Sequence, residues 1–181
     1  MSLFLATLLP GLFLALLGAV LLWPNSLVGS TAKALPRSSR GAWLFFGAGA
    51  AWFLWRLSHL NESDLIFFKT PGPVMIGFGV LSVLAFIYTP DFLAVRGLCV
   101  LMLLAAEPLL SAAYMEYHHP QRLLMVSAVY AGLGLAIYLA AAPYRLRDFF
   151  EWLFQRPARV RLAGGILLSY GLATAAAAFT Y

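Results

Sequence analysis

Three times along this chain, an apolar run of helical length stops at a proline and restarts after a short crossing near an arginine and a glycine. The stops lie at Pro24, Pro90 and Pro143, and the restarts lie at Arg40 with Gly41, Arg96 with Gly97, and Arg161 with Gly164. Proline ends helices because it lacks a backbone N–H group, and arginine is typical of loops that stay on the cytoplasmic side of a membrane. The pattern predicts membrane helices arranged as three hairpins.

The composition places the chain in lipid. Apolar residues make up 62% of its 181 residues and charged residues 10%, whereas soluble domains carry roughly 25% charged residues. So few charges cannot cover a water-exposed surface, so we expect residues 1–181 to form one polytopic domain in a lipid bilayer. The net charge of +5 indicates orientation in the membrane, and we expect no nucleic-acid partner.

The apolar runs number about six, and the third is the shortest. They are Leu3–Trp23, Gly41–Leu57, Pro73–Tyr88, Leu93–Tyr114, Leu123–Ala142 and Leu162–Phe179. Within hydrocarbon every backbone polar group needs a partner in the protein, so each run must be a helix or a barrel strand. Because no run alternates between apolar and polar residues, the fold class is predicted to be an all-α integral membrane protein with about six transmembrane helices.

Basic residues are unevenly divided between the crossings. The crossings after the first, third and fifth runs hold nine Lys and Arg residues, and the opposite crossings hold three. Positive residues stay inside, so the hairpin tips are expected to be cytoplasmic and both termini outward, in a bacterial inner (cytoplasmic) membrane.

The three hairpins also form a weak parallel pseudo-repeat. In each, a proline ends the helix, a leucine follows three residues later, and an arginine precedes the next helix. Duplication produces such repeats in membrane folds. The alternative is that proline and arginine simply occupy their usual places in any membrane protein.

A short amphipathic helix is expected in the last hairpin. Four apolar side chains share one face of it: Leu146, Phe149, Phe150 and Leu153. Polar and charged side chains lie opposite: Arg145, Asp148, Glu151 and Gln155. Such a helix fits the headgroup region of a membrane, and it can also pack on neighbouring spans of the same chain.

Small residues predict where helices approach each other closely. The fifth run carries a stripe with a spacing of four residues: Ala128, Gly132, Ala136 and Ala140. The sixth run has two shorter pairs, Gly165 with Ser169 and Gly171 with Ala175. Such stripes pack helices within one chain or join two chains.

Glu107 is the sharpest candidate for an ion or proton site. It lies well inside the fourth run, followed by Pro108, which is expected to kink the helix. A carboxylate in hydrocarbon costs roughly 2.5–3.5 kcal/mol, so it should face protein or water. We expect no basic side chain within the spans to pair with it. The alternative is a protonated glutamate that is hydrogen-bonded to a neighbouring helix.

The expected outward face holds the other candidate cluster. One crossing offers His59, Glu62 and Asp64, and another offers Glu116, His118 and His119. Imidazole and carboxylate groups ligate zinc when they converge. The spacing matches no known metal motif, so we expect a polar patch that contacts a partner or solvent, and no metal or other cofactor.

No catalytic motif is present, so we do not expect an enzyme. The sequence favours a non-catalytic accessory subunit that packs within or anchors a larger membrane complex, through other membrane subunits or self-association. The alternative is a small transporter or channel that uses Glu107.

Overall fold

The computed structural model describes residues 1–23, 26–60 and 70–181, and these fold into helices joined by turns, with no strand in the described ranges. Chain order begins with α1 (Leu3–Leu22), α2 (Ser26–Ala34), a 3-10 turn η1 (Leu35–Arg37), α3 (Ser39–Gly41), a π-helical turn η2 (Ala42–Phe46) and α4 (Gly47–Ser58). It continues with α5 (Gly72–Tyr88), α6 (Leu93–Ala113), α7 (Arg122–Ala141), α8 (Tyr144–Phe154) and α9 (Pro157–Ala178). The all-helical prediction is confirmed.

Four helices, α1, α6, α7 and α9, are long and apolar enough to cross a membrane. The other two expected spans are less regular. The second is divided into α3, the π-helical turn and the twelve-residue α4, and the third is the seventeen-residue α5. The structure therefore supports a membrane protein with four candidate spans in the described ranges.

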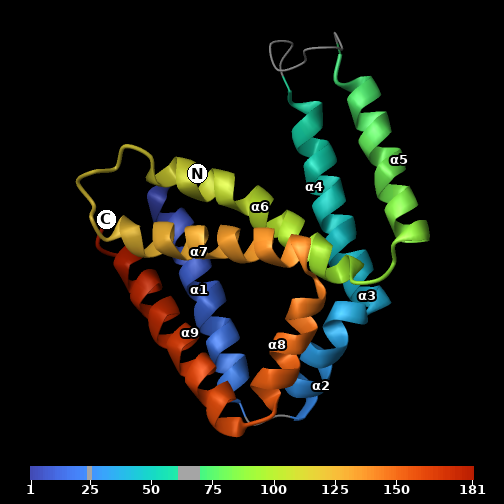
Figure 1. Cartoon of the computed structure of the whole chain (residues 1–181). Coiled ribbons are helices and arrows are strands. Elements are labelled where there is room, and N and C mark those ends of the chain that lie inside the picture. Colours follow the sequence, from blue (N-terminus) through green and yellow to red (C-terminus); the bar gives the residue numbers. More distant parts are fainter. Residues whose placement is uncertain (24–25, 61–69) are drawn as a thin grey trace.

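The first and last long helices pack against each other along their length. They run antiparallel, because Phe4 contacts Phe179 at one end while Leu22 lies beside Gly164 at the other. A Cβ atom on Gly18 would lie 2.4 Å from the backbone nitrogen of Leu168, so only a residue without a side chain fits there. Figure 1 shows α1 lying alongside α9, with both chain ends close together.

Some of the small residues that were predicted to allow close helix packing do so in the structure, and others do not. Gly171 and Ala175 meet α1, whereas Gly165 faces open space. Along α7, Ala136 is fully buried and Gly132 lies near the end of the Met102 side chain, while Ala128 is half-buried. Ala140 is exposed. The stripe on α7 is only partly used within the chain, because Met125, Val129 and Leu139 make the rest of the buried face.

Two buried clusters join α7 to α6. One contains Ala6 of α1 with Ala106, Ala113, Met125 and Val129. The other contains Val95, Cys99, Ala136 and Leu139, closed by Leu146 of α8. The α6–α7 pair is thus the central element, with α1 against one end and α8 against the other.

The α4–α5 hairpin projects from this body (Figure 1), and it is attached mainly at its base, where the π-helical turn and α4 contact α6. Where they meet, α4 and α6 run in the same direction, because Gly49 lies against Val100 and Phe46 lies against Gly97, and the two helices then diverge (Figure 1). A Cβ atom on Gly97 would be 2.2 Å from the backbone nitrogen of Phe46, so α6 touches the backbone of the π-helical turn.

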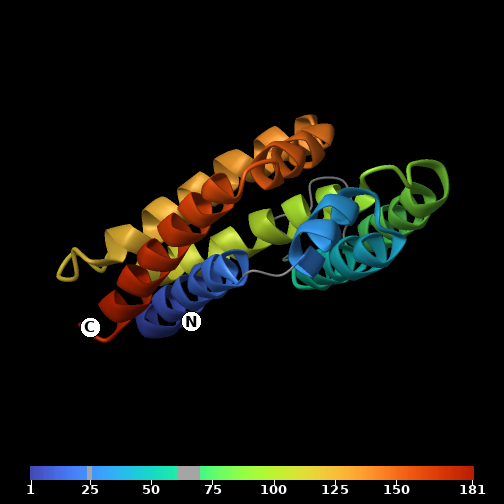
Figure 2. The same ribbon diagram turned by 90° about the horizontal axis from the view of Figure 1, so that it is seen from below.

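The three basic crossings meet at one end of the molecule. The Arg37 guanidinium group lies 5.5 Å from the centre of the Phe92 ring, which links the first crossing to the second. Phe92 is in the left-handed region, with φ of 57°, and this turns the chain from α5 into α6. Gly29 of α2 faces the Phe154 ring of α8, which links the first crossing to the third. Figure 2 shows the same assembly from below.

Candidate functional site

An ion pair joins α4 to α6. Arg56 Nη2 lies 3.1 Å from Glu107 Oε2, and the two side chains are 48% and 56% exposed. The expectation that Glu107 has no basic partner within the helices is therefore wrong. Arg56 was assigned to the outward crossing, but α4 continues to Ser58 and carries Arg56 alongside α6.

The parallel register of the two helices explains this pairing. Phe46 faces Gly97, and ten residues later on each helix, nearly three turns, Arg56 reaches Glu107. Helical geometry places Glu107 about 9 Å before the end of α6 at Ala113. The ion pair therefore lies about a turn and a half inside the end of an apolar helix.

Pro108 follows the acid within α6, and the helix continues through it to Ala113. Its ring nitrogen cannot donate to the carbonyl group of Leu104, so one backbone bond of the helix is missing beside Glu107. The acid and the arginine thus form a polar spot on an apolar helix pair, which can hold a cation, exchange a proton or meet polar groups of another chain.

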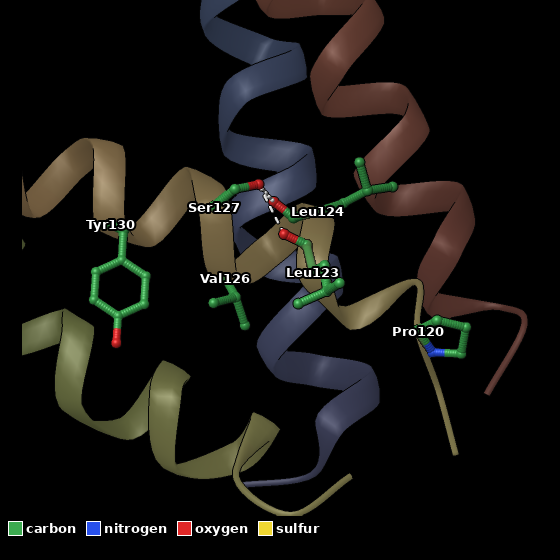
Figure 3. Close-up of a pocket in the computed structure, with 6 residues that line it drawn as sticks. All are labelled: Pro120, Leu123, Leu124, Val126, Ser127 and Tyr130. Atoms are coloured by element: carbon green, nitrogen blue, oxygen red, sulfur yellow. Dashed lines mark hydrogen bonds between the residues drawn. The ribbon is translucent and has the colours of Figure 1, made fainter. Parts of the chain in front are cut away.

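An open groove of about 670 Å³ lies along the N-terminal half of α7 (Figure 3). Its lining is Pro120, Leu123, Leu124, Val126, Ser127 and Tyr130. The Ser127 hydroxyl group bonds to the Leu123 carbonyl group at 2.7 Å and to the Tyr170 hydroxyl group at 2.8 Å. Since Glu107 is not part of the lining, this groove and the ion pair are separate features.

The described members of the expected outward patch lie at the ends of different helices. His59 lies at the end of α4, where its Nδ1 is 2.9 Å from the Trp55 carbonyl oxygen. The crossing with Glu116, His118 and His119 joins α6 to α7, at the left of Figure 1, whereas α4 ends at the top. Glu62 and Asp64 lie outside the described residues. No group of three or more metal-ligating side chains occurs within the described ranges.

His119 instead belongs to a contact between the chain ends. Its ring packs edge-on against Tyr181 at 5.2 Å, and the Tyr181 hydroxyl group is 3.1 Å from the buried Thr7 hydroxyl group. Nearby, Arg122 donates to the Ala113 carbonyl group and lies over the Tyr117 ring. These contacts connect the α6–α7 crossing to both termini.

The amphipathic helix forms as expected, as α8, but only part of its apolar face is buried. Leu146 and Leu153 are buried and Phe150 packs against the α6–α7 cluster, but Phe149 is 47% exposed. Phe149 stacks on Trp152, with 6.1 Å between ring centres. On the polar face Asp148 lies 2.8 Å from Arg147 and raises the pKa of that guanidinium group.

Sequence reasoning missed Arg56, Trp152 and the close packing of α1. A signal was present for α1, because Gly11, Ala15 and Gly18 recur at intervals of four and three residues.

Comparison with models of known protein families, with characterised proteins and with solved structures finds no match.

Proposed function

We propose that this chain is a non-catalytic integral membrane protein, an accessory subunit that packs within or anchors a larger membrane complex. One observation carries the proposal, the half-exposed Arg56–Glu107 pair on an apolar helix surface. Charged side chains within hydrocarbon face protein or water. The chain's own helices leave about half of each side chain uncovered, so we infer that a polar group of another membrane helix covers the rest.

The surroundings of the ion pair fit such a contact. Leu103, one turn before Glu107, is 40% exposed, and Trp55, beside Arg56, is 56% exposed. Tryptophan and arginine are enriched among the side chains that contribute most to binding at protein interfaces. The projecting α4–α5 hairpin, which is attached to the body mainly at its base, offers a second uncovered apolar surface to the same partner.

We further propose six spans in three hairpins with cytoplasmic tips, outward termini and a parallel pseudo-repeat, in a bacterial inner membrane. Two features support this arrangement. α3, the π-helical turn and α4 follow one another without a break, parallel to α6, and the three basic crossings contact each other at one end.

Site-specific photo-crosslinking tests the accessory role. A photoreactive residue replaces Leu103, beside the ion pair, and in a matched control it replaces Ile137, which is 62% exposed on α7. We expect position 103 to give one discrete cross-linked product in membranes, and position 137 to give none. A monodisperse monomer in mild detergent, together with no product at position 103, would contradict the proposal.

The second candidate is a small transporter or channel, favoured by the position of the ion pair beside the missing backbone bond at Pro108. It requires water to reach Glu107 along α6. Flux into vesicles that contain wild type or Glu107→Gln separates the two functions. Equal flux through both proteins would remove Glu107 from any transport mechanism.

A further inference from the structure

The end of the molecule where the crossings meet is strongly basic. Nine basic residues belong to it: Lys33, Arg37, Arg40, Arg96, Arg145, Arg147, Arg156, Arg159 and Arg161. The acidic residues there are three: Asp91, Asp148 and Glu151. Among the described residues, only Arg147 of this set forms an ion pair, with Asp148 and Glu151. The remaining positive charges therefore have no carboxylate partner in this part of the chain.

An exposed stripe of α8 brings aromatic rings to these charges. Arg145, Phe149 and Trp152 recur at intervals of four and three residues, so they lie on one side of the helix. All three are exposed, and the two rings stack on each other. The guanidinium group of Arg159 lies 4.4 Å from the centre of the Trp152 ring and donates to the Trp152 carbonyl group at 2.8 Å. Trp152 thus fixes Arg159 at the stripe.

We propose that this stripe, Arg145, Phe149, Trp152 and Arg159, binds the headgroup of an anionic phospholipid. α8 connects α7 to α9, both of which are long and apolar enough to span a membrane, so the bilayer surface is its immediate surroundings. Guanidinium groups bind phosphate oxygens through paired hydrogen bonds. Phe149 and Trp152 enter the interfacial region beside them, where amphipathic aromatic rings are favoured.

The excess of positive charge around the stripe favours an anionic headgroup over a zwitterionic one. A zwitterionic headgroup offers one phosphate and one cation, and the unpaired arginines repel that cation. Phosphatidylglycerol offers the phosphate alone, so each arginine near it contributes to binding. Inorganic phosphate lacks the acyl chains and glycerol that contact the two rings, so it is expected to bind far more weakly.

The test titrates lipids of identical acyl chains into the full-length protein in neutral detergent, with bound lipid counted by native mass spectrometry. We expect phosphatidylglycerol to bind at least about tenfold more tightly than phosphatidylcholine, and inorganic phosphate to leave both curves unchanged. Arg145→Gln and Arg159→Gln should each weaken phosphatidylglycerol binding about fivefold. Arg145→Lys keeps the charge but loses the paired hydrogen bonds, so it should weaken binding less than Arg145→Gln does.

Arg122→Gln is the matched control, because it removes one positive charge from the other end of the molecule. It should leave the preference for phosphatidylglycerol unchanged. Equal binding of the two lipids, or an equal loss in the control, would overturn the proposal. Binding of an acidic peptide with no binding of phosphatidylglycerol would also overturn it, in favour of a protein partner. If Arg159→Gln does not fold, the comparison of Arg145→Gln with Arg145→Lys, at an exposed position, still decides.

Discussion

A Cβ atom on Gly11 in α1 would lie 2.5 Å from the backbone nitrogen of Ala175 in α9, so the backbones of the first and last long helices are in direct contact. Three more glycines continue this contact: Gly18, Gly164 and Gly171. Close backbone approach of this kind increases van der Waals contact between helices where lipid provides no hydrophobic driving force. It also brings together two helices that are far apart in the sequence, near residue 1 and near residue 181.

Gly171→Ala should destabilise the protein by about 1–3 kcal/mol, because the added methyl group would lie 2.3 Å from the backbone nitrogen of Ala15 and must push α1 and α9 apart. Gly165→Ala is the matched control, since that position faces open space. It should be neutral or slightly stabilising, by up to about 1 kcal/mol. Thermal unfolding followed by circular dichroism in one detergent compares the two variants. Equal melting temperatures would show that the α1–α9 contact is looser than described.

Gly97→Ala should loosen the α4–α5 hairpin. The new methyl group would meet the backbone of Phe45 and Phe46, which cannot rotate away as a side chain does. We expect faster proteolysis of this hairpin and a loss of about 1–3 kcal/mol of stability. Gly134→Ala, where nothing lies within 4 Å, provides the comparison. Identical digestion patterns for both variants would argue against α6 as the anchor of the hairpin.

The environment of the Arg56–Glu107 pair can be measured with Arg56→Gln, Glu107→Gln and the double variant. Each single change leaves one charge unpaired on an apolar surface, so the double variant should be more stable than the two single effects predict. In lipid nanodiscs we expect a coupling energy above about 1 kcal/mol, whereas pairs exposed to water typically give about 0.2–1 kcal/mol. A coupling energy near zero would place the pair in water and remove the reason for a covering partner.

Cysteine labelling from each side of the membrane tests the proposed orientation. Thr31→Cys, in α2, and Gln121→Cys, just before α7, both lie at exposed positions. An impermeant maleimide should label residue 121 in intact cells and residue 31 only after lysis. For this test Cys99, which is buried, is replaced by alanine in both variants. Labelling of residue 31 in intact cells would reverse the topology.

Much of the helical fold was predictable because it depends on local composition. Long apolar runs must satisfy their own backbone groups in lipid, so they form helices wherever they occur. The boundaries of α1, α6 and α7 differ from the predicted runs by one residue at each end at most, and Pro143 directly precedes α8. The π-helical turn at Ala42–Phe46 was not predictable, because it accompanies contact with Gly97, a residue far away in the chain.

The candidate site was also predictable only in part. Glu107 was identifiable from the sequence, since an acid within an apolar run is unusual wherever the run packs. Its partner was not, because Arg56 lies near the end of its own run and only the parallel register of α4 and α6 brings it to the acid. The face of α8 was likewise predicted as one apolar surface, yet Leu146 is buried against α6 and α7 and Leu153 is also buried, while Phe149 is exposed.

By itself, then, the sequence determined that this protein is helical, apolar enough for a membrane, and basic at one set of crossings, because all three follow from residue type and spacing along the chain. The tertiary structure alone decided which helices are neighbours: α1 with α9, α4 with α6, and α2 with α8. Those choices depend on how closely two backbones can approach and on which side chain fills the space between them. Both conditions are set by residues distant in sequence, so no local pattern contains them.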